Sequence, residues 1–355
     1  MAKYEIINGV GIIPEGTTVI GMFSFADCTS LTEIVIPDSV KYIRQEAFRG
    51  TGLTKVVIPN SVKEIGANAF KNCTSLTEIV IPDSVTEISS NVWNSFKGCT
   101  GLTEIKVAEG NPVYDSRNNC NAIIETKSNI LQHGFATTVI PNSVKGIGKG
   151  SFAYCTSLTE IVIPESVTKI GERAFSGCTG LTEIVIPDSV TEIGDYAFYG
   201  CTGLTEIVIP ESVTKIGNGT FSGCTGLTEI VIPDSVTEIG EFAFSGCTGL
   251  TEIVIPDSVT NIGVEAFAGC TGLTEIVIPA SVTKIDDFAF ERCSGLKKVT
   301  LLGSVKKIGV RIFSECENLE IINVPAKKSD FYKRRFPESL HDKIVEMPPV
   351  KKPKK

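Results

Sequence analysis

The stretch CTGLTEIVIPDSVTEIGDYAF, residues 178–198, decides the fold of this chain. With small changes it returns at Cys201, Cys224, Cys247 and Cys270, each time 23 residues further on. A unit of this length cannot bury its own apolar residues, so neighbouring units must stack on one another. The sequence therefore predicts a repeat solenoid whose successive coils share one continuous core.

The phenylalanine that ends each copy shows how far the repeat extends. Copies at the regular step are marked by Phe152, Phe175, Phe198, Phe221, Phe244, Phe267, Phe290 and Phe313, and less regular copies by Phe25, Phe48, Phe70 and Phe96. We expect a single solenoid over residues 1–325, with a longer variant repeat at about 102–152. A C-terminal cap should follow at 326–347, and a basic, flexible tail at 348–355.

Each copy predicts two short strands. In the first, LTEIVIP, the spacing turns the leucine and both isoleucines inward and leaves Glu183 and Val185 outward. Pro187 ends this strand, because proline cannot donate a hydrogen bond to the ladder. The second strand has the inward pair Val190 and Ile193 and is followed by a glycine turn. Stacking places equivalent strands side by side in parallel sheets, about 4.8 Å apart.

The pattern LxxIxIPxxVxxIgxxAFxxC, with eight verbatim copies of LTEIVIP, resembles the leucine-rich repeat of BspA-like (Treponema pallidum-type) proteins. The resemblance covers roughly residues 10–325. NPVYDSRNNCNAIIET, residues 111–126, resembles a longer variant repeat with a hairpin, and residues 324–347 resemble the family's terminal cap. The family occurs on the surfaces of bacteria and parasitic protists. The resemblance implies a right-handed coil and a role in adhesion or protein recognition, without catalysis.

Charge and hydropathy exclude several classes of function. Residues 326–355 hold ten Lys/Arg and four Asp/Glu, which leaves 23 Lys/Arg against 37 Asp/Glu in the body. We expect this acidic body to repel nucleic acid and to favour basic partners. No apolar run approaches the roughly 18 residues of a membrane span. The N-terminus lacks an export pattern, so the location stays open between the cytoplasm, on the sequence alone, and the cell surface or exterior, on the resemblance. We expect a monomer.

The residues that usually carry catalysis or bind metals are few or badly spaced. Eleven of the twelve cysteines follow the repeat phenylalanine and none forms a CxxC pair, so zinc spacing is absent. Stacking would align their side chains in parallel, which predicts a buried, reduced column without disulfides. His133 and His341 are the two histidines, and the sequence has no Ser/His/Asp grouping or phosphate-binding loop. We therefore predict no metal, no cofactor and no enzymatic activity.

The outward glutamate of LTEIVIP is the candidate binding feature. It recurs as Glu160, Glu183, Glu206, Glu229, Glu252 and Glu275, a row of adjacent like charges that costs stability. In the second strand the sign alternates instead, through Lys169, Glu192, Lys215 and Glu238. We predict that the glutamate row binds a protein ligand, either a basic protein or a host or matrix protein. The outward Val185, Val208 and Val231 should contribute, as should Trp93 in a loop insertion.

Other interpretations stay open. The uniform glutamate could be a relic of recent duplication, with its repulsion screened by salt, and Trp93 could simply cover the core. A second class of function, an intracellular scaffold for a basic partner, is favoured by the missing export pattern and unpaired cysteines. A carboxylate-based hydrolase is the least favoured class. It needs two carboxylates in different environments, whereas identical coils give every glutamate nearly the same one.

Overall fold

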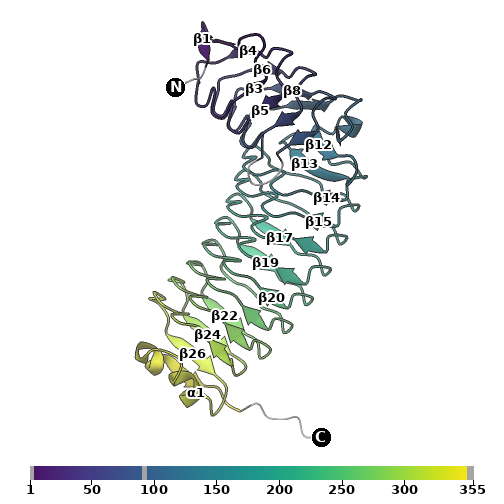
Figure 1. Ribbon diagram of the computed structural model, residues 1–355. Helices are drawn as coiled ribbons and strands as arrows, with labels where there is room; N and C mark the ends of the chain where they lie inside the picture. Colours follow the sequence, from purple (N-terminus) through teal and green to yellow (C-terminus); the bar gives the residue numbers. More distant parts are fainter. Residues whose placement is uncertain (1–3, 90–93, 350–355) are drawn as a thin grey trace. The chain divides into compact units, whose positions relative to one another are not determined.

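The computed structural model describes residues 4–89 and 94–349 and is the expected solenoid of short parallel strands (Figure 1). The chain divides into two compact units, residues 1–190 and 191–355. Trp93 and residues 350–355, for which the sequence gives predictions, lie outside the described residues.

The first unit contains two rows of parallel strands, one from each half of the repeat. The LxxIxI row comprises β2 (Val10–Ile12), β4 (Glu33–Val35), β6 (Lys55–Val57), β8 (Glu78–Ile81) and β10 (Glu104–Val107). The second row comprises β3 (Val19–Ile20), β5 (Tyr42–Ile43), β7 (Glu64–Ile65), β9 (Glu87–Ile88), β14 (Gly146–Ile147) and β15 (Lys169–Ile170). At the N-terminal end, β1 (Glu5–Ile7) pairs antiparallel with β2 and so covers the first strand edge.

The variant repeat forms the expected hairpin excursion. It consists of β11 (Tyr114–Asp115), the 3-10 turn η1 (Arg117–Asn119), β12 (Ala122–Glu125) and β13 (Ile130–Gly134). These strands pair antiparallel, and β13 then pairs parallel with β14, which returns the chain to the regular ladder. The asparagines of this stretch supply left-handed backbone, since Asn118, Asn119 and Asn121 have φ of 59°, 51° and 52°.

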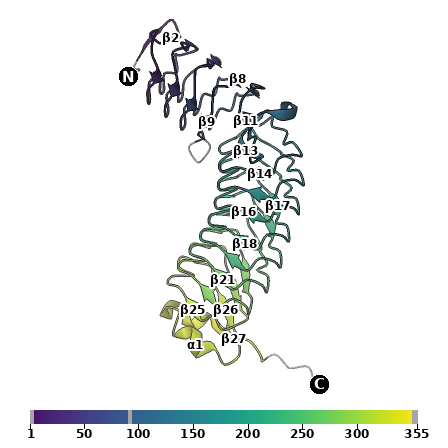
Figure 2. The ribbon, with the colours of Figure 1, turned by 45° about the vertical axis from the view of Figure 1, so that its right-hand side comes forward.

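The second unit repeats the two-row plan with greater regularity (Figure 2). Its LxxIxI row comprises β17 (Glu206–Val208), β19 (Glu229–Val231), β22 (Glu275–Ile278), β24 (Lys298–Leu301), β26 (Ile321–Val324) and β27 (Ile344–Glu346). Its second row comprises β16 (Glu192–Ile193), β18 (Lys215–Ile216), β20 (Glu238–Ile239), β21 (Asn261–Ile262), β23 (Lys284–Ile285) and β25 (Lys307–Ile308). The C-terminal segment adds α1 (Ser329–Lys333) and the 3-10 turn η2 (Glu338–Lys343).

The core of each unit is a stack of repeated side chains. In the second unit, the rings of Phe221, Phe244 and Phe267 stack with centroids 5.5 Å and 5.3 Å apart. Beside this column the cysteines are free, as predicted, and Cys247 donates from its Sγ to the Phe221 carbonyl of the preceding coil at 3.2 Å. Burial raises the pKa of the Cys247 thiol to about 12. A protonated thiol of this kind acts as a small apolar residue.

Candidate binding surface

An exposed row of valines runs along the LxxIxI strands of each unit. In the first unit Val162 and Val185 form a parallel bridge and are 82% and 78% exposed. In the second unit the row consists of Val208, Val231, Val254 and Val277, which are 46–78% exposed. Scattered apolar residues at a surface are ordinary, whereas a contiguous exposed row is less common.

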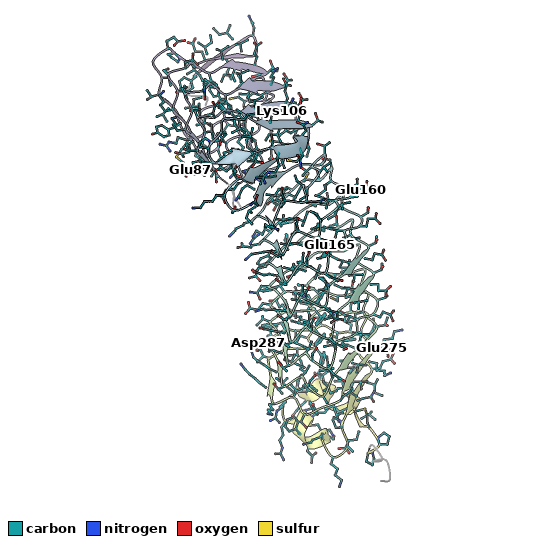
Figure 3. All side chains as sticks on the ribbon, turned by 90° about the vertical axis from the view of Figure 1, so that its right-hand side faces the viewer. Glu87, Lys106, Glu160, Glu165, Glu275 and Asp287 are labelled. Carbon is teal, nitrogen blue, oxygen red and sulfur yellow. The ribbon has the colours of Figure 1, made fainter. Side chains whose placement is uncertain are left out.

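The predicted glutamates lie directly beside these valines. Glu206 pairs in register with Glu229 and Val208 with Val231, so each row is in step with the other. Glu160 and Glu183 are exposed in the first unit, and Glu206, Glu229, Glu252 and Glu275 are exposed in the second. We call these two rows the valine–glutamate face. In Figure 3, Glu275 of this face and Asp287 project from opposite sides of the second unit.

In the second unit a lysine neutralises the last glutamate of the row but not those before it. Lys298 follows Glu275 in the ladder, and its ammonium lies 3.1 Å from the Glu275 carboxylate. In the first unit Lys55 forms an ion pair with Glu78 in the same way. Within the described part of the chain, Glu206, Glu229 and Glu252 have no ion-pair partner. Three like charges therefore stand side by side, which costs stability on a sheet.

The second strand row shows that the repeat can avoid this cost. Lys215 and Glu238 are neighbours in register, and the Lys215 ammonium lies 3.3 Å from the Glu238 carboxylate. The alternating signs predicted from the sequence are thus realised as an ion pair. In the second unit the second strand row therefore mixes both signs, whereas the first strand row is uniformly negative from Glu206 to Glu275.

A hollow of about 650 Å³ lies on the valine–glutamate face of the second unit. Val254, Val277 and Leu302 supply its apolar lining. Its acidic residues are Glu252, Glu275, Asp234 and Asp257. The two aspartates were missed by the sequence analysis, although the signal was present as the acidic residue that follows the proline in most copies. The hollow combines an apolar floor with a rim of one charge sign, which suits a basic, partly apolar polypeptide.

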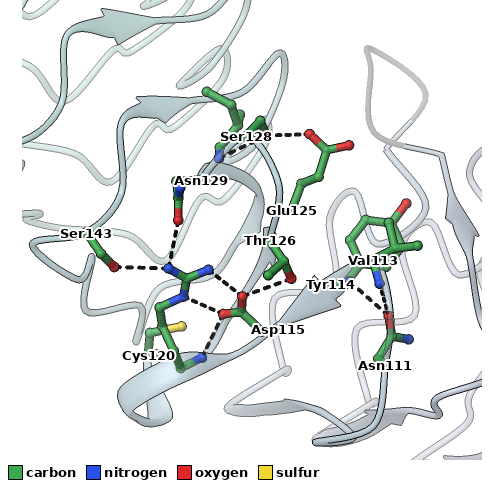
Figure 4. A network of polar contacts seen from close by, with 12 residues as sticks. Asn111, Val113, Tyr114, Asp115, Cys120, Glu125, Thr126, Ser128, Asn129 and Ser143 are labelled. Carbon is green, nitrogen blue, oxygen red and sulfur yellow. Dashed lines mark hydrogen bonds and ion pairs between the residues drawn. The ribbon is translucent and has the colours of Figure 1, made fainter.

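A different, polar cluster lies in the variant hairpin of the first unit (Figure 4). Arg117 donates to Asp115 at 2.7 Å, to Asn129 at 2.7 Å and to Ser143 at 3.3 Å, and Thr126 donates to Asp115 at 3.0 Å. Burial raises the pKa of Asp115, but these hydrogen bonds outweigh it and hold the pKa below its usual range. The cluster holds the hairpin to the next coil and leaves no free charge for a ligand.

Within the described part of the chain, the cysteine outside the repeat column and the buried histidine do not form a site. Cys120 is buried, and burial raises the pKa of its thiol, so it lacks the thiolate that a reactive cysteine needs. His133 is fully buried with both ring nitrogens unpartnered in the described residues. No cluster of three or more His, Cys, Asp or Glu suited to a metal ion occurs within residues 4–89 and 94–349.

In the same ranges no helix is both long and apolar enough to cross a membrane.

Comparison with known proteins places the chain in a family. The sequence profile of the BspA type leucine rich repeat region matches residues 10–121, 131–246 and 214–341. The chain belongs to the BspA-type leucine-rich-repeat family. Comparison with curated proteins found no match.

Solved structures of leucine-rich-repeat proteins share the fold. One from Bacteroides ovatus is 31% identical, with a TM-score of 0.63 over 95% of this chain and 83% of that one. Another from Eubacterium ventriosum is 29% identical, with a TM-score of 0.68 over 78% of this chain and 81% of that one. Leucine-rich-repeat proteins are generally protein-interaction modules, because a stack of repeats offers an extended surface.

Proposed function

We propose that the chain is a non-catalytic protein-recognition module that binds a protein ligand through the valine–glutamate face. The observation that carries this proposal is that two strands align exposed Val208 with Val231 and, beside them, Glu206 with Glu229, neither of which has an ion-pair partner in the described residues. Both rows are unfavourable in water, one by exposed apolar area and the other by repulsion. A ligand with apolar and basic side chains would bury the valines and neutralise the glutamates, and both changes lower the free energy.

The ligand class follows from the chemistry of the face. Each valine that a ligand covers contributes up to roughly 1.5 kcal/mol, whereas the glutamates act mainly on association rate and specificity. A partner with exposed Lys or Arg beside apolar residues meets both requirements. Adhesion to host or matrix proteins is the form of this function that the family suggests, and a scaffold for a basic intracellular protein is the second form.

A carboxylate-based hydrolase is the function with the least support. All the glutamates of the face are exposed and occupy equivalent ladder positions. General acid catalysis needs one carboxyl in a distinct, less polar environment. Glu229→Gln should therefore weaken binding in part, whereas an enzyme that used Glu229 would lose turnover entirely.

A charge-neutral variant of the face tests the proposal. Peptides would be selected on the intact protein from a random displayed library, and their affinity measured by fluorescence anisotropy. We compare a variant with Glu183, Glu206, Glu229 and Glu252 changed to Gln. Its control carries the same change at four exposed glutamates off the face, Glu87, Glu241, Glu317 and Glu338.

The selected peptides should be rich in Lys, Arg and apolar residues. Their affinity should fall about tenfold or more on the face variant and remain near wild type on the control, since screened carboxylate contacts contribute a few tenths of a kcal/mol each. Equal affinity for both variants would remove the face from the binding function. The glutamate row would then be a relic of duplication.

A further inference from the structure

The last regular coil of the second unit has an edge without a neighbour. Five backbone groups of the coil before it form hydrogen bonds with this last coil. Lys306 and Gly309 donate to the carbonyls of Thr283 and Ile285 at 2.9 and 2.8 Å, and Phe288, Phe290 and Arg292 donate to those of Val310, Ile312 and Ser314 at 3.0, 3.0 and 2.8 Å. Lys307 also donates to the Thr283 carbonyl, at 3.1 Å, and these bonds belong to the ladder between consecutive coils.

The equivalent groups of the last coil have no partner in the described part of the chain. They are the carbonyls of Lys306 and Ile308 and the N–H groups of Arg311, Phe313 and Glu315. We call residues 306–315 the open terminal edge. The two carbonyls lie on the short strand β25 and just before it, and the three N–H groups lie on the turn that follows. Unpaired donors and acceptors at the end of a ladder are a template for a further segment of polypeptide.

The C-terminal segment covers the other half of this coil but not the open terminal edge. β27 pairs with β26 and so completes the LxxIxI row. Phe336 packs edge-on against Phe313, with centroids 5.8 Å apart, and so completes the aromatic column. Figure 2 shows β25, β26, β27 and α1 together at this end.

A hollow remains between the open terminal edge and the cap. Its volume is about 680 Å³, and it is lined by the consecutive residues 308–317 and, from the cap, by Arg335, Phe336 and Leu340. Its floor is apolar: Val310 is 60% exposed. Ile308 is only partly buried, whereas its equivalent in the preceding coil, Ile285, is fully buried. The hollow therefore lies where a further coil would stack, and no described residue fills it.

The charge around the open terminal edge is opposite to that of the body. The basic side chains that line the hollow are Arg311, Arg335 and Lys343, and the acidic ones are Glu315 and Glu317. Lys306 and Lys307 lie on the open terminal edge itself, and Glu338 and Asp342 lie in η2 outside the lining. Glu315 is already paired with Arg292 at 3.0 Å, and Lys307 keeps a contact of 3.9 Å with Asp286. An acidic occupant is therefore favoured. Residues 350–355 carry four lysines, so their charge has the wrong sign for this place.

We propose that the open terminal edge binds an extended acidic segment of a partner protein, which adds a further half-coil to the ladder. The segment makes hydrogen bonds with these five backbone groups, sets an apolar side chain against the partly exposed Ile308, and sets carboxylates against Lys307 and Arg311. This is strand addition with charge complementarity. It does not depend on the valine–glutamate face.

The chain itself provides a suitable probe. The segment TEIGEFAFSG, residues 237–246, carries two glutamates and already makes these bonds to the coil that precedes it. Thr237 and Gly240 donate to Thr214 and Ile216 at 3.0 and 2.9 Å, and the carbonyls of Glu241, Ala243 and Ser245 accept at 2.7, 2.8 and 2.7 Å from Gly219, Phe221 and Gly223. Its Glu238 also pairs with Lys215, the ladder equivalent of Lys307.

The experiment measures binding of this capped, fluorescent ten-residue peptide to the full chain by anisotropy. A control peptide carries N-methylglycine at the position of Gly240, which removes one donor and places a methyl group against the edge. The protein variant is Lys307→Glu with Arg311→Glu, and its matched control is Lys41→Glu with Lys63→Glu, two exposed lysines of the first unit. Hydrogen exchange then locates the site.

The native peptide should bind, and the N-methylated peptide should not. The charge-reversed variant should bind about tenfold more weakly, whereas its control and the four-glutamine variant of the face should match wild type. Exchange at the amides of Arg311, Phe313 and Glu315 should slow. Equal binding of both peptides, or protection at another place, would overturn the proposal. Self-association that protects these three amides without peptide, seen by sedimentation velocity, would also overturn it by making a second copy the occupant.

Discussion

The aromatic column is continuous in the second unit and broken in the first. From Phe198 to Phe313 every ring stacks on the next, with centroids 5.2–5.6 Å apart. In the first unit the stack that ends at Phe96 meets His133 edge-on at 5.5 Å. Only at Phe152 does the column resume. Regular coils repeat one and the same side-chain contact, whereas the variant repeat needs a different residue at each contact.

Two residues show what the break requires. A side chain at Gly134 would place its Cβ 2.1 Å from the Phe152 ring, so glycine is needed for that ring to sit on β13. His133 supplies a ring beside Phe96, but its nitrogens find no hydrogen bond in the described residues. A buried polar group without a partner is costly. The break in the column therefore depends on specific residues, and one of them costs stability. The regular column has no such requirement.

The largest expected effect comes from breaking the regular column. Phe244→Ala removes a fully buried ring between Phe221 and Phe267. The lost burial and the cavity should reduce the free energy of unfolding of the second unit by about 3–5 kcal/mol. Denaturant unfolding measures the loss, and hydrogen exchange assigns it to residues 191–355.

The control for this change is Tyr199→Ala in the same unit, where the ring is 42% exposed. That substitution should cost under about 1 kcal/mol. Comparable losses from the two variants would mean that the stacked rings do not hold the coils together.

The next effect concerns the broken region and depends on pH. Burial lowers the pKa of His133 to about 3, from an ordinary value of 6.5. Above pH 6.5 both the folded and unfolded states hold a neutral ring, so stability does not depend on this group. Below pH 6.5 the unfolded state takes up a proton that the folded state refuses. Stability of the first unit should then fall by about 1.4 kcal/mol per pH unit, or about 3 kcal/mol by pH 4.5.

His133→Phe isolates this contribution from that of the carboxylates. The variant keeps a ring beside Phe96 and removes the titration. The stability difference between His133→Phe and wild type should therefore grow in favour of the variant as pH falls from 6.5 to 4.5, measured by urea unfolding at each pH. A difference that stays constant would show that the imidazole reaches water or a partner in the folded state.

The regular region could be predicted from the sequence far better than the broken one. A step of 23 residues fixes the stacked Phe244 and the outward Glu229, because the same contact recurs in every coil. Arg117, in contrast, bonds to Asn129 and Ser143, which lie 12 and 26 residues away and belong to no repeat. Such pairs depend on how the hairpin folds back, which no periodicity describes.

Identical sequence also gave local differences that a pattern cannot anticipate. LTEIVIP forms a three-residue strand at β17 and β19, yet around Val185 it forms a single parallel bridge to Val162. The inward residues are buried in every case, so the core was predictable and the extent of backbone pairing was not. The open terminal edge was missed for a similar reason. The aromatic residues of the cap indicate a cover, but not which half of the coil it covers.

The smallest expected effect tests whether the adjacent glutamates of the regular region lower its free energy of unfolding. Glu229→Lys places a cation between Glu206 and Glu252 and so reproduces on the first strand row the arrangement of Lys215 and Glu238 on the second. Two repulsive contacts become attractive, so the free energy of unfolding should rise by about 0.2–1 kcal/mol at low salt. The gain should shrink at 1 M NaCl because salt screens exposed charges.

Glu241→Lys makes the same change of charge where the ladder neighbours, Asn218 and Val264, are uncharged, and it should leave stability nearly unchanged. If Glu229→Lys gains no more than Glu241→Lys, solvent already screens the row, and duplication alone explains why the glutamate persists. If it does gain, the natural chain keeps a costly charge at a position where its own second row shows that a lysine fits. A cost that a single substitution could remove, and that is still retained, is most simply explained by a partner that needs the negative row.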